Sequence, residues 1–501
     1  MSNNRKGWAA LLAELGARSD AAEAMGGDAR IARQHARGRL TARERITALT
    51  DTDSFREYGL LAGGHSPHGA PPVPADGLVG GVARIDGRNV VLLVEDFTVQ
   101  GGSIGHPNAA KRARLVRLAL EIHSPLLILL DGAGERASNQ AERYPHAPGD
   151  LQLLADIQGA IPVVALVLGT SAGHGALAAM FADLVIMHRD SALFSAGPPL
   201  VKAAMGIDTT AEELGSAQMH TRESGVAHLC CDTEQACFDS ARRFLMLTCE
   251  PGAEEQSGAK SALTPRPSLG DEPPAHAVTS HNDALLDIIP PEVSQPYDMR
   301  KVLAEITDPD SLLELQPDFG RTLITALATI GGQRCMIVAN QPAVQAGAIT
   351  RQAAEKACHF IDLAHRFALP LVALVDNPGV MPGPAAERSG VLRAAGKMFL
   401  AQRHFRGRKI IVTLRKAFGF GSSVMGMNPW DRQTISLAFP GVSLGGVPAL
   451  GAAAATGADA AEASALQARQ SGAWAGADSM AFDRVIDPRN LRGELIQELL
   501  S

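Results

Sequence analysis

The sequence has few aromatic residues: Trp, Tyr and Phe together make up 4% of its 501 residues. This composition argues against nucleic-acid modules, which stack bases on aromatic side chains. The net charge is −7 and no basic run occurs. A phosphate-rich ligand must therefore be met by local groups rather than by a general positive field, and we expect no nucleic-acid partner.

Cysteine is also scarce, since the chain has only six. None of them forms a CxxC pair with a second pair at zinc-ribbon spacing, which predicts reduced thiols and no metal site. No stretch of about 18 uninterrupted apolar residues occurs, so we expect no membrane span. The first twenty residues have no apolar core of a secretory signal. These features favour a cytoplasmic protein.

The pattern that is present alternates strands with helices. Apolar runs predict strands at 78–85, 126–130 and 161–168, and amphipathic stretches predict helices at 108–123 and 150–159. Such alternation is typical of α/β folds with both faces of the sheet covered. Before these elements, Thr41 and Glu44 have the spacing of a helix capping box.

The length suits two domains. Residues 251–284 are rich in Pro, Ser, Gly and Ala and have no apolar period, which indicates a linker. We therefore predict an N-terminal domain over 1–250, a linker over 251–284 and a C-terminal domain over 285–501.

The two halves repeat each other. Residues 108–134 align without a gap with residues 353–379, an offset of 245. At an offset of 246, Gly173-His174-Gly175 aligns with Gly419-Phe420-Gly421, and each turn follows an apolar strand. Generic similarity between α/β units is the alternative, but the shared order of helix, proline, strand, acidic turn and glycine turn favours duplication of one fold.

A glycine turn between a buried strand and a helix can direct backbone N–H groups at one point. Such a group of amides can hold a phosphate or an oxyanion that forms during a reaction. One GxG turn alone is a weak signal. Two of them at equivalent places suit a reaction in which both reactants become enolates, namely transfer of a carboxyl group.

The order of segments resembles the carboxyltransferase β subunits of propionyl-CoA and related acyl-CoA carboxylases, in the crotonase-like superfamily. The resemblance covers nearly the whole chain. The segments that carry it are 40–46, 95–98 with 101–103, 197–202, 212–215, 224–228, 296–300, 374–379 and 415–419.

The resemblance implies an α/β fold of two duplicated crotonase-like domains. The N-terminal half would bind an acyl-CoA, and backbone amides of Gly173 and His174 would hold its thioester enolate. The C-terminal half would receive carboxybiotin, with amides of Phe420 and Gly421 at the ureido oxygen. The family commonly forms a hexamer, a trimer of dimers, with each active site across a dimer interface.

Biotin would arrive on a separate carrier protein that a biotin carboxylase subunit loads, since the chain has no Met-Lys-Met segment and no ATP-grasp-like glycine loop. The resemblance also gives substrate-binding candidates around the turns: Gly102, Ser103, Gly134, Ala172, Lys202, Gly379, Gly419 and Ser423. A basic helix face at Lys111, Arg112 and Arg114 is a further candidate for CoA phosphates, with a solvated face as the alternative.

Three positions depart from the family pattern. His174 and Phe420 stand where a small residue is usual, and a positive φ there would strain them. Ser423 stands where propionyl and acetyl types often have aspartate, which suggests a different acyl group, with a harmless variation as the alternative. Three alternative functions stay open: a biotin-dependent acyl-CoA decarboxylase subunit, a crotonase-type hydratase or isomerase, and a catalytically altered scaffold. The glutamate that hydratases need is missing after Gly175.

Overall fold

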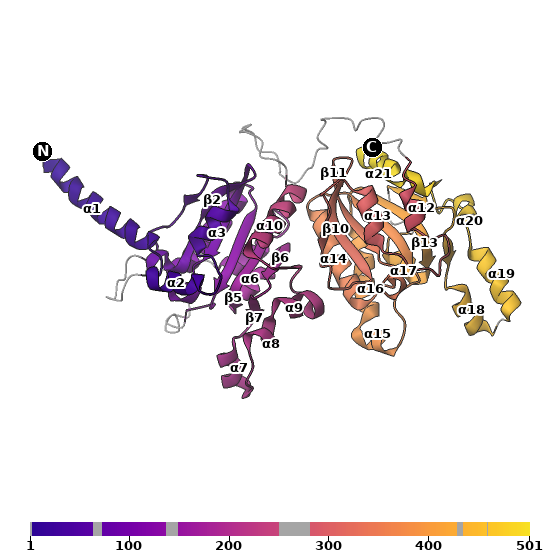
Figure 1. Cartoon of the computed structure of the whole chain (residues 1–501), viewed down its shortest axis with the longest axis horizontal. Helices are drawn as coiled ribbons and strands as arrows, with labels where there is room; N and C mark the ends of the chain where they lie inside the picture. The colour runs from indigo at the N-terminus through magenta and orange to yellow at the C-terminus, as the bar shows by residue number, and fades with distance from the viewer. Residues whose placement is uncertain (1–2, 64–72, 137–148, 250–280, 428–433, 458) are drawn as a thin grey trace. The chain divides into compact units, whose positions relative to one another are not determined.

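The computed structural model describes residues 3–63, 73–136, 149–249, 281–427, 434–457 and 459–501. The chain divides into two compact units, Met1–Ala259 and Lys260–Ser501. Each unit is built on one eight-stranded sheet (Figure 1). Most of the expected linker, residues 251–280, lies outside the described residues.

The sheet of unit 1 has the order β1-β2-β3-β4-β5-β6-β8, with β7 paired to the end of β5. Its first two pairings are antiparallel and the others are parallel. The strands are β1 (Arg56–Glu57), β2 (Leu78–Ile85), β3 (Arg88–Glu95), β4 (Leu126–Gly132), β5 (Val163–Ala172), β6 (Leu184–His188), β7 (Ala192–Phe194) and β8 (Leu229–Cys231).

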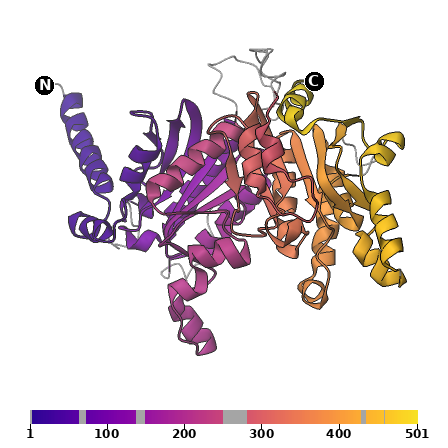
Figure 2. The ribbon, with the colours of Figure 1, turned by 45° about the vertical axis from the view of Figure 1, so that its right-hand side comes forward.

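Helices α3, α6 and α10 accompany this sheet, whereas α7 extends away from it (Figures 1 and 2). The helices are α1 (Asn3–Glu23), α2 (Asp28–His35), α3 (Ala42–Leu49), α4 (His106–Glu121), α5 (Asp150–Asp156), α6 (His174–Ala179), α7 (Pro198–Met205), α8 (Ala211–Gly215), α9 (Ala217–Met219) and α10 (Glu234–Thr248). The predicted capping box is confirmed: Thr41 Oγ1 accepts from the Glu44 amide at 3.3 Å, and Glu44 accepts from the Thr41 amide at 2.8 Å.

Unit 2 repeats the same sheet in the order β16-β14-β13-β12-β11-β10-β9, with β15 paired to the end of β13. Again the hairpin pairings are antiparallel and the rest are parallel. The strands are β9 (Leu313–Leu315), β10 (Leu323–Ile330), β11 (Gln333–Asn340), β12 (Leu371–Asn377), β13 (Lys409–Phe418), β14 (Ile435–Ala438), β15 (Ser443–Gly445) and β16 (Arg484–Val485).

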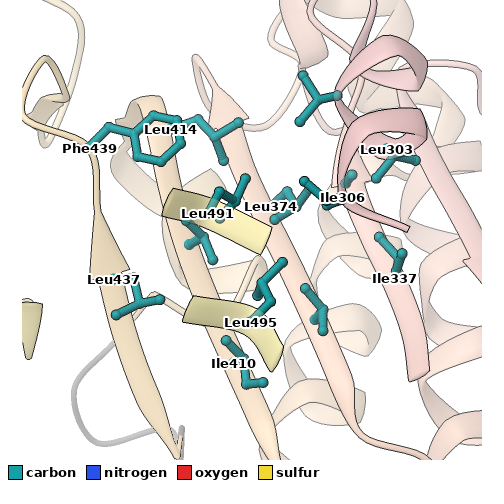
Figure 3. Close-up of a cluster of buried hydrophobic side chains, with 14 of the residues drawn as sticks. Leu303, Ile306, Ile337, Leu374, Ile410, Leu414, Leu437, Phe439, Leu491 and Leu495 are labelled. Atoms are coloured by element: carbon teal, nitrogen blue, oxygen red, sulfur yellow. The ribbon is translucent and has the colours of Figure 1, made fainter. Parts of the chain in front are cut away.

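The helices of unit 2 are α12 (Ala284–Ile288), α13 (Met299–Ile306), α14 (Arg351–Arg366), α15 (Pro384–Ser389), α16 (Val391–His404), α17 (Gly419–Val424), α18 (Ala449–Thr456), α19 (Ala460–Gln470), α20 (Trp474–Asp478) and α21 (Leu491–Leu500). Figure 3 shows how α13 and α21 cover one face of the sheet. Leu303, Ile306, Leu491 and Leu495 meet strand residues such as Leu374 in a fully buried cluster. Removing apolar area from water on both faces holds the parallel strands together.

The duplication is confirmed by irregularities of the backbone that both units share at the same offset. The β4–β5 register shifts between Leu130 and Gly132, and the β12–β13 register shifts between Val375 and Asn377, which are 245 positions on. A tight turn with positive φ at Gln100 recurs at Gln345, again 245 positions on. Shared irregularities at one offset indicate one ancestral unit rather than two similar α/β domains.

Candidate active site

The first turn, Ala172–Gly175, joins the end of β5 to α6. Gly173 has φ 56° and ψ −111°, a conformation that residues with a Cβ avoid. Gly134 lies against this turn with φ 82°, and a Cβ on it would be 2.7 Å from the Ala172 carbonyl oxygen. The structure thus brings together Gly134, Ala172 and Gly173, which are three of the predicted site residues.

The backbone N–H groups of Gly173 and His174, both predicted to hold an oxyanion, differ in their hydrogen bonding. The N–H of Gly173 donates to the carbonyl of Phe194 at 3.0 Å. The amide nitrogen of His174 lies on the side of Gly134, 3.8 Å from the position of a Gly134 Cβ. Within this turn, the His174 amide is therefore the better candidate donor for an oxyanion.

His174 and Phe420 adopt no positive φ, because the left-handed conformation falls on Gly173 and Gly419 before them. The backbone strain considered from the sequence is thus absent at both positions. Their side chains change the surroundings of the turns but do not distort them.

The side chain of His174 leads into a chain of buried charges that the sequence did not reveal. His174 Nε2 lies 2.7 Å from Asp150 Oδ1. Asp150 Oδ2 lies 3.9 Å from Arg112 Nη1, and Arg112 Nη2 lies 2.5 Å from Glu95 Oε1. We call Glu95, Arg112 and Asp150, the charged residues behind His174, the buried charge chain. It links β3, α4, α5 and α6 beneath the first turn.

Lys111 and Arg112 do not form the exposed basic helix face that the sequence suggested. Lys111 Nζ donates to the Leu78 carbonyl at 2.6 Å, and Arg112 is 1% exposed in its ion pair with Glu95. Both the phosphate-binding prediction and its solvated alternative are wrong for these two residues, because α4 turns this face into the unit. Arg114 is exposed and pairs with Glu121.

Gly102 and Ser103 belong to the loop that packs on the end of β4. A Cβ on Gly102 would clash with the Asp131 carbonyl oxygen. Ser103 is 7% exposed, and its Oγ donates to the Gln100 carbonyl at 2.8 Å. Arg136 donates to the Ser103 carbonyl at 2.8 Å and fixes the loop from the other side.

A hollow of about 280 Å³ lies beside this loop. Its lining combines three arginines of the α2 region with the loop after β3: Arg30, Arg33, Gln34, Arg37, Phe97, Thr98, Gln100 and Gly101. We call it the arginine pocket. Its lining contains no acidic residue, and Arg37 stacks on Phe97 with its guanidinium carbon 5.8 Å from the ring centre. Planar guanidinium groups recognise phosphate well.

The arginine pocket is linked to the first turn by direct neighbours. Gly101, which lines the pocket, accepts a hydrogen bond from the Ala133 amide at 2.9 Å. Gln34, also in the lining, donates to Asp131 Oδ2 at 3.1 Å. Residues 131–134 then lead to the Ala172 carbonyl through Gly134. Lys202, in contrast, lies on exposed α7 and pairs with Asp208 at 2.6 Å.

The second turn, Phe418–Gly421, repeats the backbone of the first. Gly419 has φ 51°, and a Cβ on it would clash with the Gly446 carbonyl oxygen. A Cβ on Gly421 would clash with Asn377 Oδ1 and lie 2.5 Å from the Cα of Gly379. Gly379, Gly419 and Gly421 therefore come together here, and Ser423 follows on α17.

The two turns differ in chemistry. Asn340 and Ala357 occupy the positions equivalent to Glu95 and Arg112, 245 residues on. Phe420 replaces His174, and its side chain is 43% exposed. The first turn thus lies over buried charges, whereas the second presents an aromatic side chain. Two different ligands fit this asymmetry better than two copies of one ligand.

Neither a metal-binding cluster nor a membrane helix occurs in the described part of the chain. Among those residues no group of three or more His, Cys, Asp or Glu side chains could hold a metal ion. No helix in the same ranges has the length and apolarity needed to cross a bilayer.

Comparisons with known proteins agree with this architecture. The carboxyl transferase domain family matches residues 33–499. The methylmalonyl-CoA decarboxylase α subunit of Veillonella parvula is 33% identical over 79% of this chain and 76% of its own length. The propionyl-CoA carboxylase carboxyltransferase subunit of Haloferax mediterranei is 33% identical over 80% and 76%.

A solved structure extends the match to three dimensions. The transcarboxylase 12S structure, a hexamer with methylmalonyl-CoA and methylmalonic acid bound, superposes with a TM-score of 0.87. It is 30% identical and covers 100% of this chain and 96% of that chain. The chain belongs to the carboxyl transferase domain family, with the carboxyltransferase subunits of biotin-dependent acyl-CoA carboxylases, and its two units have the crotonase-like fold.

Proposed function

We propose that the chain is the carboxyltransferase subunit of a biotin-dependent acyl-CoA carboxylase and that its two turns are two oxyanion sites. The observation that carries this assignment is the pair of glycine turns at equivalent strand ends of duplicated units. Each turn has its positive φ on a glycine and its close approach to a second glycine, Gly134 or Gly379.

In this proposal unit 1 binds the acyl-CoA. The thioester carbonyl lies at the first turn, where the His174 amide faces Gly134. The phosphates at the far end of CoA lie in the arginine pocket, where Arg30, Arg33 and Arg37 supply the positive charge that the whole chain lacks. Donors aimed at the enolate oxygen stabilise charge that develops in the transition state.

Unit 2 receives the biotin end of a separate carrier protein. The glycines at the second turn allow its backbone to pack closely against Gly379 and Gly446, and Phe420 offers an apolar face suited to the fused rings of biotin. When bound, carboxybiotin supplies carbon dioxide and a basic ureido nitrogen. The amides of Phe420 and Gly421 would stabilise the ureido oxygen.

The transcarboxylase 12S relative is a hexamer. We propose a hexamer, a trimer of dimers, for this chain, in which a first turn of one subunit faces a second turn of its neighbour. Light scattering on the purified chain tests the assembly. A monomer that is active in carboxyl transfer would contradict it.

The function is tested with the full chain, a biotin carboxylase and a biotin carrier protein. Labelled bicarbonate is supplied with ATP and a panel of acyl-CoAs of different length. We expect label to enter at least one acyl-CoA. Ser423, smaller and uncharged where short-chain types often have aspartate, favours a longer or less polar acyl group. A formed complex that labels no acyl-CoA would overturn the proposal.

The similarity to a methylmalonyl-CoA decarboxylase subunit favours one alternative, the same half-reaction run toward carbon dioxide release. The same complex, given an acyl-CoA with a labelled α-carboxyl group, distinguishes the two. Net release of labelled carbon dioxide without ATP, and no fixation with ATP, would assign the decarboxylase direction.

A further inference from the structure

The imidazole of His174 is oriented by a buried carboxylate. Its Nε2 lies 2.7 Å from Asp150 Oδ1, and the side chains of His174 and Asp150 are 25% and 2% exposed. His174 is also the residue whose backbone amide faces Gly134 at the first turn. An amide suited to an oxyanion and an imidazole therefore belong to one residue.

The groups behind Asp150 keep its carboxylate charged. Burial acts to raise the pKa of Asp150, but the hydrogen bond from His174 and the charge of Arg112 outweigh it and leave the pKa lowered. Arg112 in turn is held by Glu95 and by Asn108 Oδ1, 2.8 Å from its Nε. Glu95 and Arg112 are thus the charged groups that face the pair, from β3 and α4.

This arrangement selects one tautomer of the imidazole. A charged carboxylate at Nε2 keeps the proton on that nitrogen, as an orienting carboxylate does in catalytic triads. Nδ1 then carries the lone pair, and no residue in the described ranges bonds to it. The carboxylate would also stabilise the imidazolium formed when Nδ1 takes up a proton.

We propose that His174, oriented by Asp150, is a general base for the α-proton of the acyl thioester, so that this chain enolises acyl-CoA without biotin. The inference rests on the proposed function, because it places the thioester at the first turn. The α-carbon–hydrogen bond breaks, its proton goes to Nδ1, and its electron pair forms the enolate whose oxygen the turn holds. In heavy water, deuterium returns from the imidazolium to the α-carbon, and no oxidant or second reactant is needed.

The second turn lacks three of the residues that form this arrangement. Phe420, Asn340 and Ala357 stand at the positions of His174, Glu95 and Arg112. A purely structural role for the pair, fastening α5 to α6, is the competing explanation. That role needs the hydrogen bond to Asp150 but no basic nitrogen, so the two explanations predict different behaviour for His174→Gln.

The test is deuterium exchange at the α-carbon of an acyl-CoA in heavy water, followed by NMR, with the full chain and no carrier protein. The acyl-CoA is one that calorimetry shows to bind. We expect exchange with the unaltered chain. His174→Gln keeps a donor for Asp150 but has no base, and we expect it to slow exchange about a hundredfold or more. His174→Gly should lose exchange equally and regain part of it when free imidazole is added.

The control variant is Leu177→Ala, which changes an exposed side chain of the same helix α6. It should exchange like the unaltered chain. No exchange by the unaltered chain on a bound acyl-CoA, or undiminished exchange by His174→Gln, overturns the inference. Carboxylation by the complex without such exchange removes the inference and leaves the proposed function standing. Exchange without carboxylation of any acyl-CoA removes the proposed function and leaves the inference standing.

Discussion

Lys111 of α4 and Lys356 of α14 lie 245 positions apart at equivalent points of the two units, and each donates its ammonium to a backbone carbonyl. Lys111 Nζ is 2.6 Å from the Leu78 carbonyl oxygen, and Lys356 Nζ is 3.1 Å from that of Gln316. Burial lowers the pKa of Lys111 to about 8 and that of Lys356 to about 7. Duplication has thus preserved a buried cation in both sheets' covering helices.

Lys356 makes stability depend on pH in a definite direction. Its pKa is about 7 in the folded chain, whereas an exposed lysine has a pKa of 10.5. Between these values the unfolded state binds more protons, so stability rises with pH; the full penalty of the buried charge applies below pH 7. From pH 7 to 9 the gain should be about 2 kcal/mol.

Lys356→Met removes this slope. We expect the variant to be more stable than the unaltered chain at pH 7 and to lose that advantage toward pH 9, in urea unfolding of the chain. Lys301→Met, at an exposed position of α13, is the matched control and should leave the slope in place. An unchanged pH slope in Lys356→Met would show that the lysine is not neutralised by burial.

Arg415 organises one side of unit 2 through contacts that only its planar group can make. Its Nε lies 2.8 Å from Asp376 Oδ2, and its Nη1 donates to the carbonyls of Glu292 and Gln295, both at 2.9 Å. The guanidinium also stacks on Tyr297, 4.6 Å from the ring centre.

Arg415→Ala leaves the buried Asp376 carboxylate with one ion-pair partner, Lys416 at 2.8 Å, so we expect a loss of about 1.5–3 kcal/mol in stability. Arg415→Lys should recover only a part, because lysine cannot reproduce the fork and the stacking. Unfolding in guanidinium chloride measures the stability of both variants. Arg489→Ala, which removes an exposed arginine of the same unit, should cost little by comparison.

Sequence reasoning located the elements whose signals are local. The strand before each turn and the capping box at Thr41 are both set by residues close in sequence. The repeat at one offset then fixed the equivalence of the two turns, because irregularities such as those at Gln100 and Gln345 are inherited together.

The side-chain environment of the first turn could not be derived in this way. Asp150 reaches His174 only because the start of α5 lies beside α6, which no spacing in the sequence encodes. Lys111 and Arg112 were misjudged for the same reason: their partners Leu78 and Glu95 belong to other strands. A signal for the arginine pocket was present, since Arg30 and Arg33 lie on one face of α2 and Arg37 follows its end, but Phe97 completes the pocket from a distant loop.

The arginine pocket predicts a specific kinetic effect. Arg33→Ala and Arg37→Ala should each raise the KM for acyl-CoA about tenfold, because each removes a charge-assisted contact to phosphate. The KM for the matching acyl-pantetheine, which has no nucleotide, should not change. Steady-state carboxylation with both substrates measures this.

Arg117→Ala on α4, an exposed arginine outside the pocket, is the control. It should leave both KM values unchanged. Equal increases for acyl-CoA and acyl-pantetheine in the pocket variants would place the nucleotide end elsewhere.

Alanine substitutions at Gly134 and Gly87 distinguish the effect of backbone strain from the effect of a displaced first turn. Both have positive φ, 82° and 76°, so an alanine at either position should cost about 1–2 kcal/mol. Only at Gly134 does the new Cβ meet another group, the Ala172 carbonyl oxygen at 2.7 Å; around Gly87 nothing lies within 4 Å.

Because that carbonyl precedes Gly173, its displacement must move the first turn and the His174 amide. We expect Gly134→Ala to lower kcat/KM for carboxyl transfer by a hundredfold or so, the effect of losing about one oxyanion donor. Gly87→Ala should lose similar stability and keep its activity. Thermal unfolding and carboxylation are measured on both variants, and an equal loss of activity in both would mean that strain, rather than the geometry of the turn, governs the rate.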